Sequence, residues 1–108
     1  MYEILIEDLE LDIIIGILDF ERKNRQKVVV NVKIEYQYKK ESFIDYVDII
    51  NIIETLLLKN RYYLLEDAIL EIGDNILDRY LNIKSLYLKI VKPDIIKNGT
   101  VGVSKLWN

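Results

Sequence analysis

The sequence predicts an α+β fold, in which a four-stranded antiparallel sheet carries two helices on one face. Two segments of alternating apolar residues come first, two segments with helical periodicity follow, and two further alternating segments end the chain. Only one proline and four glycines interrupt the 108 residues, so tight turns are few. The expected order is therefore β-β-α-α-β-β, built from long elements.

The first two strands are expected to form a hairpin. Every odd residue from Leu9 to Ile17 is Leu or Ile, which gives this segment one apolar face. Apolar residues occupy alternate positions again from Val28 to Tyr38. The polar segment 19–26 between them predicts a loop longer than a two-residue turn, and such loops commonly carry functional residues.

The middle of the chain predicts two consecutive helices. Segments 49–57 and 65–80 repeat apolar residues at intervals of three and four positions. Two last strands are expected at Leu86–Val91 and near Val101–Trp107, separated by a turn around Gly99. Because no repeat or change of composition divides the chain, residues 1–108 are expected to form a single domain. The uncovered sheet face and the two sheet edges favour oligomerisation.

Composition excludes several classes of function. The chain has no Cys and no His, which excludes disulfides, the usual zinc sites and Ser-His or Cys-His catalysis. A net charge of -3 without a basic stripe argues against nucleic-acid binding. The short apolar stretches and the acidic N-terminal segment predict a soluble cytoplasmic protein without a membrane segment. Any catalysis must use carboxylates, Lys, Tyr or hydroxyl groups.

Five ordered blocks resemble the dihydroneopterin aldolase family. They are I-G-I-L-D-F-E at 15–21, Gln26, Y-V-D-I at 46–49, L-L-E at 64–66, and K-P at 92–93 with V-G-V at 101–103. Each block alone is weak, but their order along a β-β-α-α-β-β pattern is specific. The resemblance implies the tunnelling fold, in which sheets of several subunits join into an oligomeric barrel, commonly as four-subunit rings stacked into a homo-octamer.

The resemblance also implies a reaction in folate biosynthesis. Members of the family cleave 7,8-dihydroneopterin into 6-hydroxymethyl-7,8-dihydropterin and glycolaldehyde by a retro-aldol step, without a metal, a cofactor or a lysine Schiff base. The substrate contains a C=N bond beside the breaking C–C bond, and this imine takes up the electrons as an enamine forms. The protein needs only to hold the ring and to move protons.

Three residues match catalytic positions of the family. Lys92 would shuttle a proton to or from the dihydropterin ring, and it has the strand parity of the apolar residues before it. Tyr46 would donate or relay a proton across a subunit boundary. Glu21 would bind the hydroxyls of the substrate tail or an ordered water. Without the resemblance, these residues would more often be a solvated lysine, a packed aromatic and a solvated carboxylate.

Other matched positions would bind the substrate. Glu66 would accept two parallel hydrogen bonds from the pterin ring, as a carboxylate can. Backbone groups near Leu65, and near Phe43 and Ile44 of a neighbouring subunit, would complete the polar edge of the ring. Gln26 would lie near the substrate tail. No metal ligand is expected.

Two departures and two alternatives accompany this interpretation. Ile15 precedes the glycine where many members have a histidine, and Asp45 stands where histidine or serine is often found. An epimerase acting on dihydroneopterin or its triphosphate is the first alternative, since basic residues near the tail-binding end would suit a phosphorylated tail; they are Arg22, Lys23 and Arg25. A non-catalytic pterin-binding scaffold is the second, and it would be expected to have lost part of the Lys-Tyr-Glu set.

Overall fold

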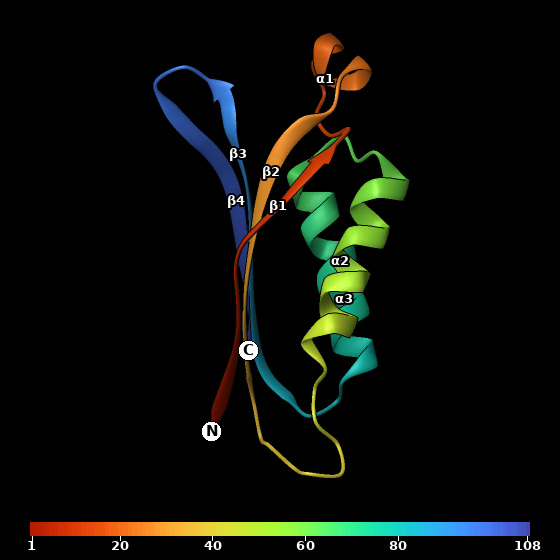
Figure 1. Cartoon of the computed structure of the whole chain (residues 1–108), viewed down its shortest axis with the longest axis vertical. Coiled ribbons are helices and arrows are strands. Elements are labelled where there is room, and N and C mark those ends of the chain that lie inside the picture. Colours follow the sequence, from red (N-terminus) through yellow and green to blue (C-terminus); the bar gives the residue numbers. More distant parts are fainter.

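The computed structural model describes all 108 residues and confirms the predicted α+β architecture. Four antiparallel strands form one sheet in the order β1-β2-β3-β4; they are β1 (Tyr2–Ile13), β2 (Gln26–Tyr36), β3 (Ile83–Ile96) and β4 (Gly99–Trp107). Helices α2 (Tyr46–Asn60) and α3 (Leu65–Arg79) cover one face, and the short helix α1 (Asp19–Lys23) lies at one end of the molecule (Figure 1). None of the helices has the length and apolar character needed to span a membrane.

The first strand differs from its predicted boundaries, Leu9 to Ile17, because it contains a β-bulge. Its pairing with β2 shifts between Ile6 and Leu9, and Asp8 there has a φ of 58°. The Asp8 backbone N–H donates to Asn31 Oδ1 at 3.0 Å, which satisfies the group that the ladder leaves unpaired. The bulge moves the core-facing side chains from even to odd positions, so the alternation visible from Leu9 onward does not extend to the true start of the strand.

The predicted loop at 19–26 contains α1, which was not predicted. The helix has only five residues, too few to show an apolar stripe. Its first turn is closed by the Glu21 carboxylate, whose Oε1 accepts the Leu18 backbone N–H at 3.1 Å. The helix is therefore closed by the same carboxylate for which the family resemblance implies a function.

The core lies between the sheet and the two long helices. It contains 19 buried apolar residues, and burying one such side chain contributes about 1.5–3 kcal/mol. Alternate residues of β2 and β3 face the helices, including Val30, Ile34, Leu88 and Ile90. On the helix side, Gly73 leaves room for the Trp107 indole, since a Cβ there would lie 2.3 Å from its ring. This contact holds the end of β4 against α3.

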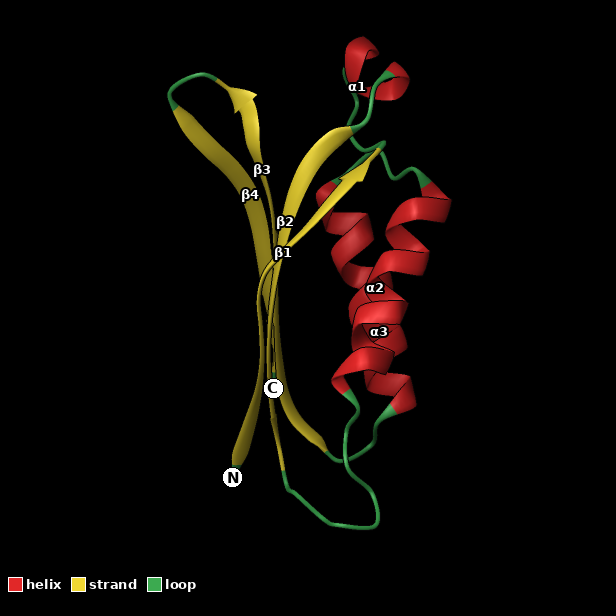
Figure 2. Cartoon of the chain, in the orientation of Figure 1, coloured by secondary structure: helices red, strands yellow, loops and turns green.

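The sheet opens at the end that carries α1. Pairing between β2 and β3 reaches Val29 and Val91, so Lys92 and Pro93 lie beyond it, and the β3–β4 register shifts after Lys92. Proline has no N–H to donate, which suits a position where the neighbouring strand has separated. Figure 2 shows the β1–β2 pair diverging from the β3–β4 pair at this end. The Lys92 side chain is therefore on the helix-facing side, as predicted, at the point where the two pairs part.

Candidate active site

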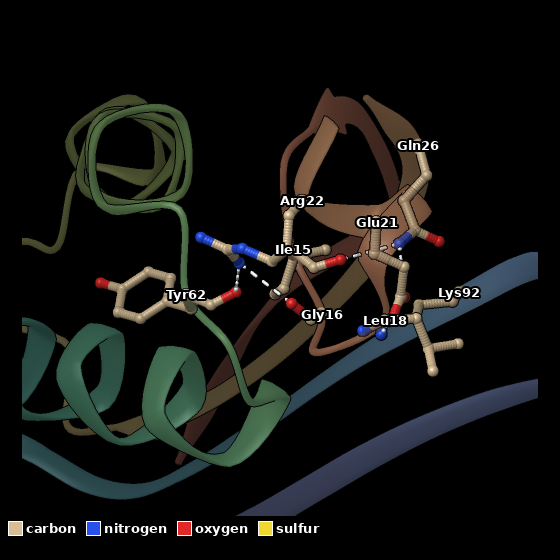
Figure 3. Close-up of polar contacts among 8 residues, drawn as sticks. All are labelled: Ile15, Gly16, Leu18, Glu21, Arg22, Gln26, Tyr62 and Lys92. Carbon is tan, nitrogen blue, oxygen red and sulfur yellow. Dashed lines mark hydrogen bonds and ion pairs between the residues drawn. The ribbon is translucent and has the colours of Figure 1, made fainter. Parts of the chain in front are cut away.

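A buried ion pair between Lys92 and Glu21 is the centre of the candidate site. Lys92 Nζ donates to Glu21 Oε2 at 2.7 Å, and the two side chains are only 12% and 2% exposed. Gln26 Nε2 donates to the same carboxylate oxygen at 2.8 Å and to the Ile15 carbonyl at 2.8 Å. Figure 3 shows the lysine, from β3, and the amide at the start of β2 both directed to the Glu21 carboxylate of α1. Three segments distant in sequence thus supply one polar cluster.

The charge state of Glu21 follows from this cluster. Burial raises the pKa of the Glu21 carboxyl, but hydrogen bonds from Lys92, Gln26 and the Leu18 N–H, together with the charge of Lys92, outweigh burial and leave the pKa below its ordinary value. Glu21 is therefore an ionised carboxylate at neutral pH. A proton donor and a negatively charged acceptor lie side by side in a poorly hydrated place, which is an arrangement suited to proton transfer.

Gly16 gives the carboxylate its space. Its φ of 125° is in the region that favours glycine, and a Cβ would lie 2.1 Å from Glu21 Cδ. The Gly16 N–H donates to the Tyr62 carbonyl at 3.0 Å, which ties this turn to the α2–α3 connection. Gly16 belongs to the first block of the family resemblance, but its packing against Glu21 could not be predicted from the sequence, because that contact depends on the conformation of residues 16–21.

The proposed pterin anchor lies at the same end of the molecule. Leu65 and Glu66 begin α3, directly after the α2–α3 connection that contacts Gly16. Leu65 is buried, whereas the Glu66 side chain is exposed at the start of the helix. The end of the fold that carries Lys92, Glu21 and Gln26 therefore also presents Glu66.

The structure does not bring Tyr46, Phe43 and Ile44 to this cluster. Tyr46 begins α2, at the end of that helix opposite to the α2–α3 connection. The 15 residues of the helix span about 22 Å. Tyr46 and Phe43 are both 61% exposed, and the Ile44 side chain is buried. The divergent Asp45 is the N-cap of α2, where its side chain accepts the Val47 N–H at 2.9 Å. These residues form a second, separate surface within one chain.

The other departure, Ile15, also has a structural role. Its side chain is fully buried in the core, while its backbone carbonyl accepts the hydrogen bond from Gln26. That hydrogen bond does not depend on the side chain at position 15. No group of three or more acidic, His or Cys side chains is placed to hold a metal ion.

Comparisons with known proteins concern the family and the fold of the chain. The family model of dihydroneopterin aldolase (FolB) matches residues 4–105. The structure is similar to Escherichia coli dihydroneopterin aldolase in complex with neopterin, with a TM-score of 0.90 and 23% identity over 100% of both chains. Dihydroneopterin aldolase from Burkholderia thailandensis bound to guanine gives a TM-score of 0.81 at 18% identity, over 98% of this chain and 89% of that one.

A more distant likeness concerns another enzyme. Urate oxidase from Bacillus sp. TB-90 gives a TM-score of 0.76 at 14% identity, over 98% of this chain and 45% of that one. At these identities the structural likeness shows a shared fold. No curated protein sequence matches the chain.

Proposed function

This chain belongs to the dihydroneopterin aldolase family and has the lyase function of that family, and we propose that Lys92 and Glu21 carry out its proton transfers. The observation that carries the proposal is the 2.7 Å contact between Lys92 Nζ and Glu21 Oε2, buried where the sheet opens. The ligands of the two similar aldolases, neopterin and guanine, support a pterin as the small molecule bound here. The substrate proposed is 7,8-dihydroneopterin.

The reaction needs balanced proton movements, which the cluster can supply. As the C–C bond breaks, a side-chain hydroxyl of the substrate loses its proton and becomes the aldehyde oxygen of glycolaldehyde. The electrons of that bond form a C=C bond to the imine carbon, the C=N π electrons move to the ring nitrogen, and the nitrogen takes up a proton to give an enamine. The enamine carbon then gains a proton and the nitrogen loses one, which restores C=N in the product. Lys92 would exchange protons with the ring, and Glu21, directly or through a water that it holds, would accept the proton of the tail hydroxyl.

The position of Tyr46 supports a site shared between subunits. Tyr46 and Phe43 are exposed at the far end of the chain from Lys92, so they could meet a substrate only on a neighbouring molecule. We propose that the sheets join edge to edge into a ring, since β1 and β4 both end the sheet without a partner. Tyr46 of one subunit would then relay a proton at the Lys92 of another. The proposed assembly is an octamer of two such rings in the cytoplasm.

The triphosphate epimerase alternative receives little support from the arginines that suggested it. The Arg22 guanidinium donates to the carbonyls of Gly16 and Tyr62, and Arg25 donates to the Asp12 carbonyl at 3.2 Å. Guanidinium groups engaged by backbone carbonyls are poorly placed to clamp a phosphate chain. Of the three basic residues only Lys23 lacks such a contact. Epimerisation of dihydroneopterin itself passes through the same enamine as cleavage does. The two activities are distinguished by analysis of their products.

The first test is incubation with 7,8-dihydroneopterin in the presence of a chelator, with chromatographic separation of the products. We expect 6-hydroxymethyl-7,8-dihydropterin as the main product. The epimer 7,8-dihydromonapterin alone would favour the epimerase, and no turnover by folded protein would revive the scaffold alternative.

A second experiment tests the role of Lys92. Lys92→Ala should lower turnover by about two to four orders of magnitude, as loss of a general acid–base group does. Lys84→Ala, an exposed lysine on the same strand, is the control. Lys92→Ala leaves a buried carboxylate without its cation, which could by itself unfold the protein. Lys92→Gln keeps a hydrogen-bond donor near Glu21 and therefore serves as a second variant that is expected to fold. Near-normal turnover by either folded Lys92 variant would contradict the assignment.

A further inference from the structure

The Arg22 side chain joins two segments that the chain separates by about 40 positions. Its Nη1 donates to the Gly16 carbonyl at 3.0 Å and to the Tyr62 carbonyl at 3.2 Å, and its Nη2 donates to the Arg61 carbonyl at 3.0 Å. The guanidinium carbon also lies 3.8 Å from the centre of the Tyr63 ring. One side chain thus contacts the turn before α1 and three consecutive residues of the α2–α3 connection.

The geometry of these contacts requires an arginine. Arg61, the C-cap residue that follows α2, is in a left-handed conformation with φ 45° and ψ 54°, so the chain leaves the helical path here. The planar guanidinium presents several N–H groups in a fixed fork and can stack on an aromatic ring at the same time. A lysine ammonium at the end of a flexible chain cannot reproduce this set of directions.

Arg22 and Glu21 are neighbours on α1 but point in different directions. Figure 3 shows Glu21 directed to Lys92 and Gln26, and Arg22 directed to Tyr62 and the carbonyl of Gly16. Because α1 has only five residues, its two outward contacts are mechanically connected. Movement of the α2–α3 connection relative to Arg22 would be passed to the carboxylate that pairs with Lys92.

The first turn of α3 has few other polar contacts to hold it. Its N-cap residue, Leu64, makes no side-chain capping hydrogen bond. The connection before it is held by Arg22 and by the hydrogen bond from the Gly16 N–H to the Tyr62 carbonyl, and the Tyr62 hydroxyl also donates to Glu71 of α3. The contacts to the backbone carbonyls of the connection run from the segment that carries Glu21. The backbone that leads into this first turn, and with it Glu66, is therefore tied to the segment that places the proton-transfer pair.

We propose that Arg22 is a positioning residue, which sets the first turn of α3 relative to Lys92 and Glu21. The inference rests on the proposed function, because it assigns the pterin ring to Glu66 and the proton transfers to the buried pair. Arg22 itself would not touch the substrate. It would align the ring-binding half of the site with the reacting half, and a misplacement of about 1 Å between such halves can cost about 100-fold in rate.

The test uses Arg22→Lys, with Arg25→Lys as a matched control. Arg25 is a nearby arginine that also donates to a backbone carbonyl, but only within the β1–β2 region. For Arg22→Lys we expect kcat to fall about 10- to 100-fold, while the affinity for a non-reacting pterin analogue changes less than about threefold. Arg25→Lys should keep both values. A merely structural arginine would lower thermal stability and leave kcat per folded site unchanged.

A double-mutant cycle gives the second readout. In a Lys92→Gln background the proton-transfer step is already impaired, so Arg22→Lys should reduce the residual turnover by much less than it does in the wild type. The same fold-reduction in both backgrounds, or a normal kcat for folded Arg22→Lys, would overturn the proposal. The wild-type protein is assayed alongside, and if it failed to cleave 7,8-dihydroneopterin, the proposed function itself would be refuted instead.

Discussion

Replacement of Gly16 by alanine tests the packing that creates the Lys92–Glu21 pair. An added Cβ would lie 2.1 Å from Cδ, 2.2 Å from Oε1 and 2.3 Å from Oε2 of Glu21, far inside van der Waals contact. The carboxylate cannot simply turn aside, because it is buried and accepts hydrogen bonds from Lys92, Gln26 and the Leu18 N–H. Either the backbone at residue 16 must shift or the Lys92–Glu21 ion pair must break.

The expected cost follows from two separate effects. A non-glycine residue held at a φ of 125° stores about 1–3 kcal/mol of backbone strain. Displacing one member of a buried ion pair costs about 3–5 kcal/mol, because the other is left without compensation. Gly16→Ala should therefore lower the free energy of unfolding by about 4–8 kcal/mol, which is comparable with the whole stability of many domains. Turnover should fall with it.

The assay is urea unfolding at one fixed protein concentration, followed by the fluorescence of Trp107, the sole tryptophan. Gly99→Ala is the control, since a Cβ there meets nothing closer than 3.7 Å and its φ lies outside the left-handed region. In a Glu21→Ala background the clash with the carboxylate is gone, so Gly16→Ala should cost only the strain, about 1–3 kcal/mol. Equal losses in the presence and absence of Glu21 would refute the reasoning, as would wild-type stability of Gly16→Ala.

Two further predictions concern the same end of the fold. The pKa of Glu21 is below its ordinary value of 4.5, so its ionised form contributes stability that is complete above the unfolded pKa and is lost as the pH falls through the lower folded pKa. The stability advantage of wild type over Glu21→Gln should be constant between about pH 6 and 8 and shrink in acid, and an advantage that persisted undiminished to about pH 2 would contradict this. Glu66→Ala should weaken binding of pterin ring analogues about 10- to 100-fold, as loss of hydrogen bonds to a charged group does, with little change in Tm because the side chain is exposed. Calorimetric titration beside Asp67→Ala, from the same turn, checks it, and unchanged affinity would reject the anchor role.

Much of the fold could be predicted because its longest elements have regular patterns. The alternation through β2 and β3 and the periodicity of α2 and α3 each reflect one face packed on a single core. Prediction from sequence periodicity failed where the backbone departs from a regular strand or a long helix. The bulge at Asp8 changes which residues of β1 face the core, and α1 is shorter than the periodicity needed to detect it.

The site was predictable in a different way. The parity of β3 placed Lys92 on the helix-facing side, but nothing in the pattern identified its partner, which lies 71 positions earlier. The resemblance to known aldolases named Glu21, Gln26 and Lys92, and the structure brings these three together. The contacts of Arg22 and Gly16 depend on backbone carbonyls and on a turn conformation, which residue types do not reveal. The roles of the three residues that the resemblance named, like those of Tyr46 and Glu66, stay predictions.

The separation of Tyr46 from Lys92 along one chain has a genetic consequence. In the proposed ring, each chain would take part in two sites, offering its α1 end to one and the start of α2 to the other. A defect at either end would then spoil a different site, and two defective alleles, one for each end, could restore some intact sites when expressed together. Two alleles with defects at the same end could not do so, because every site of the mixed ring would then contain a defective end.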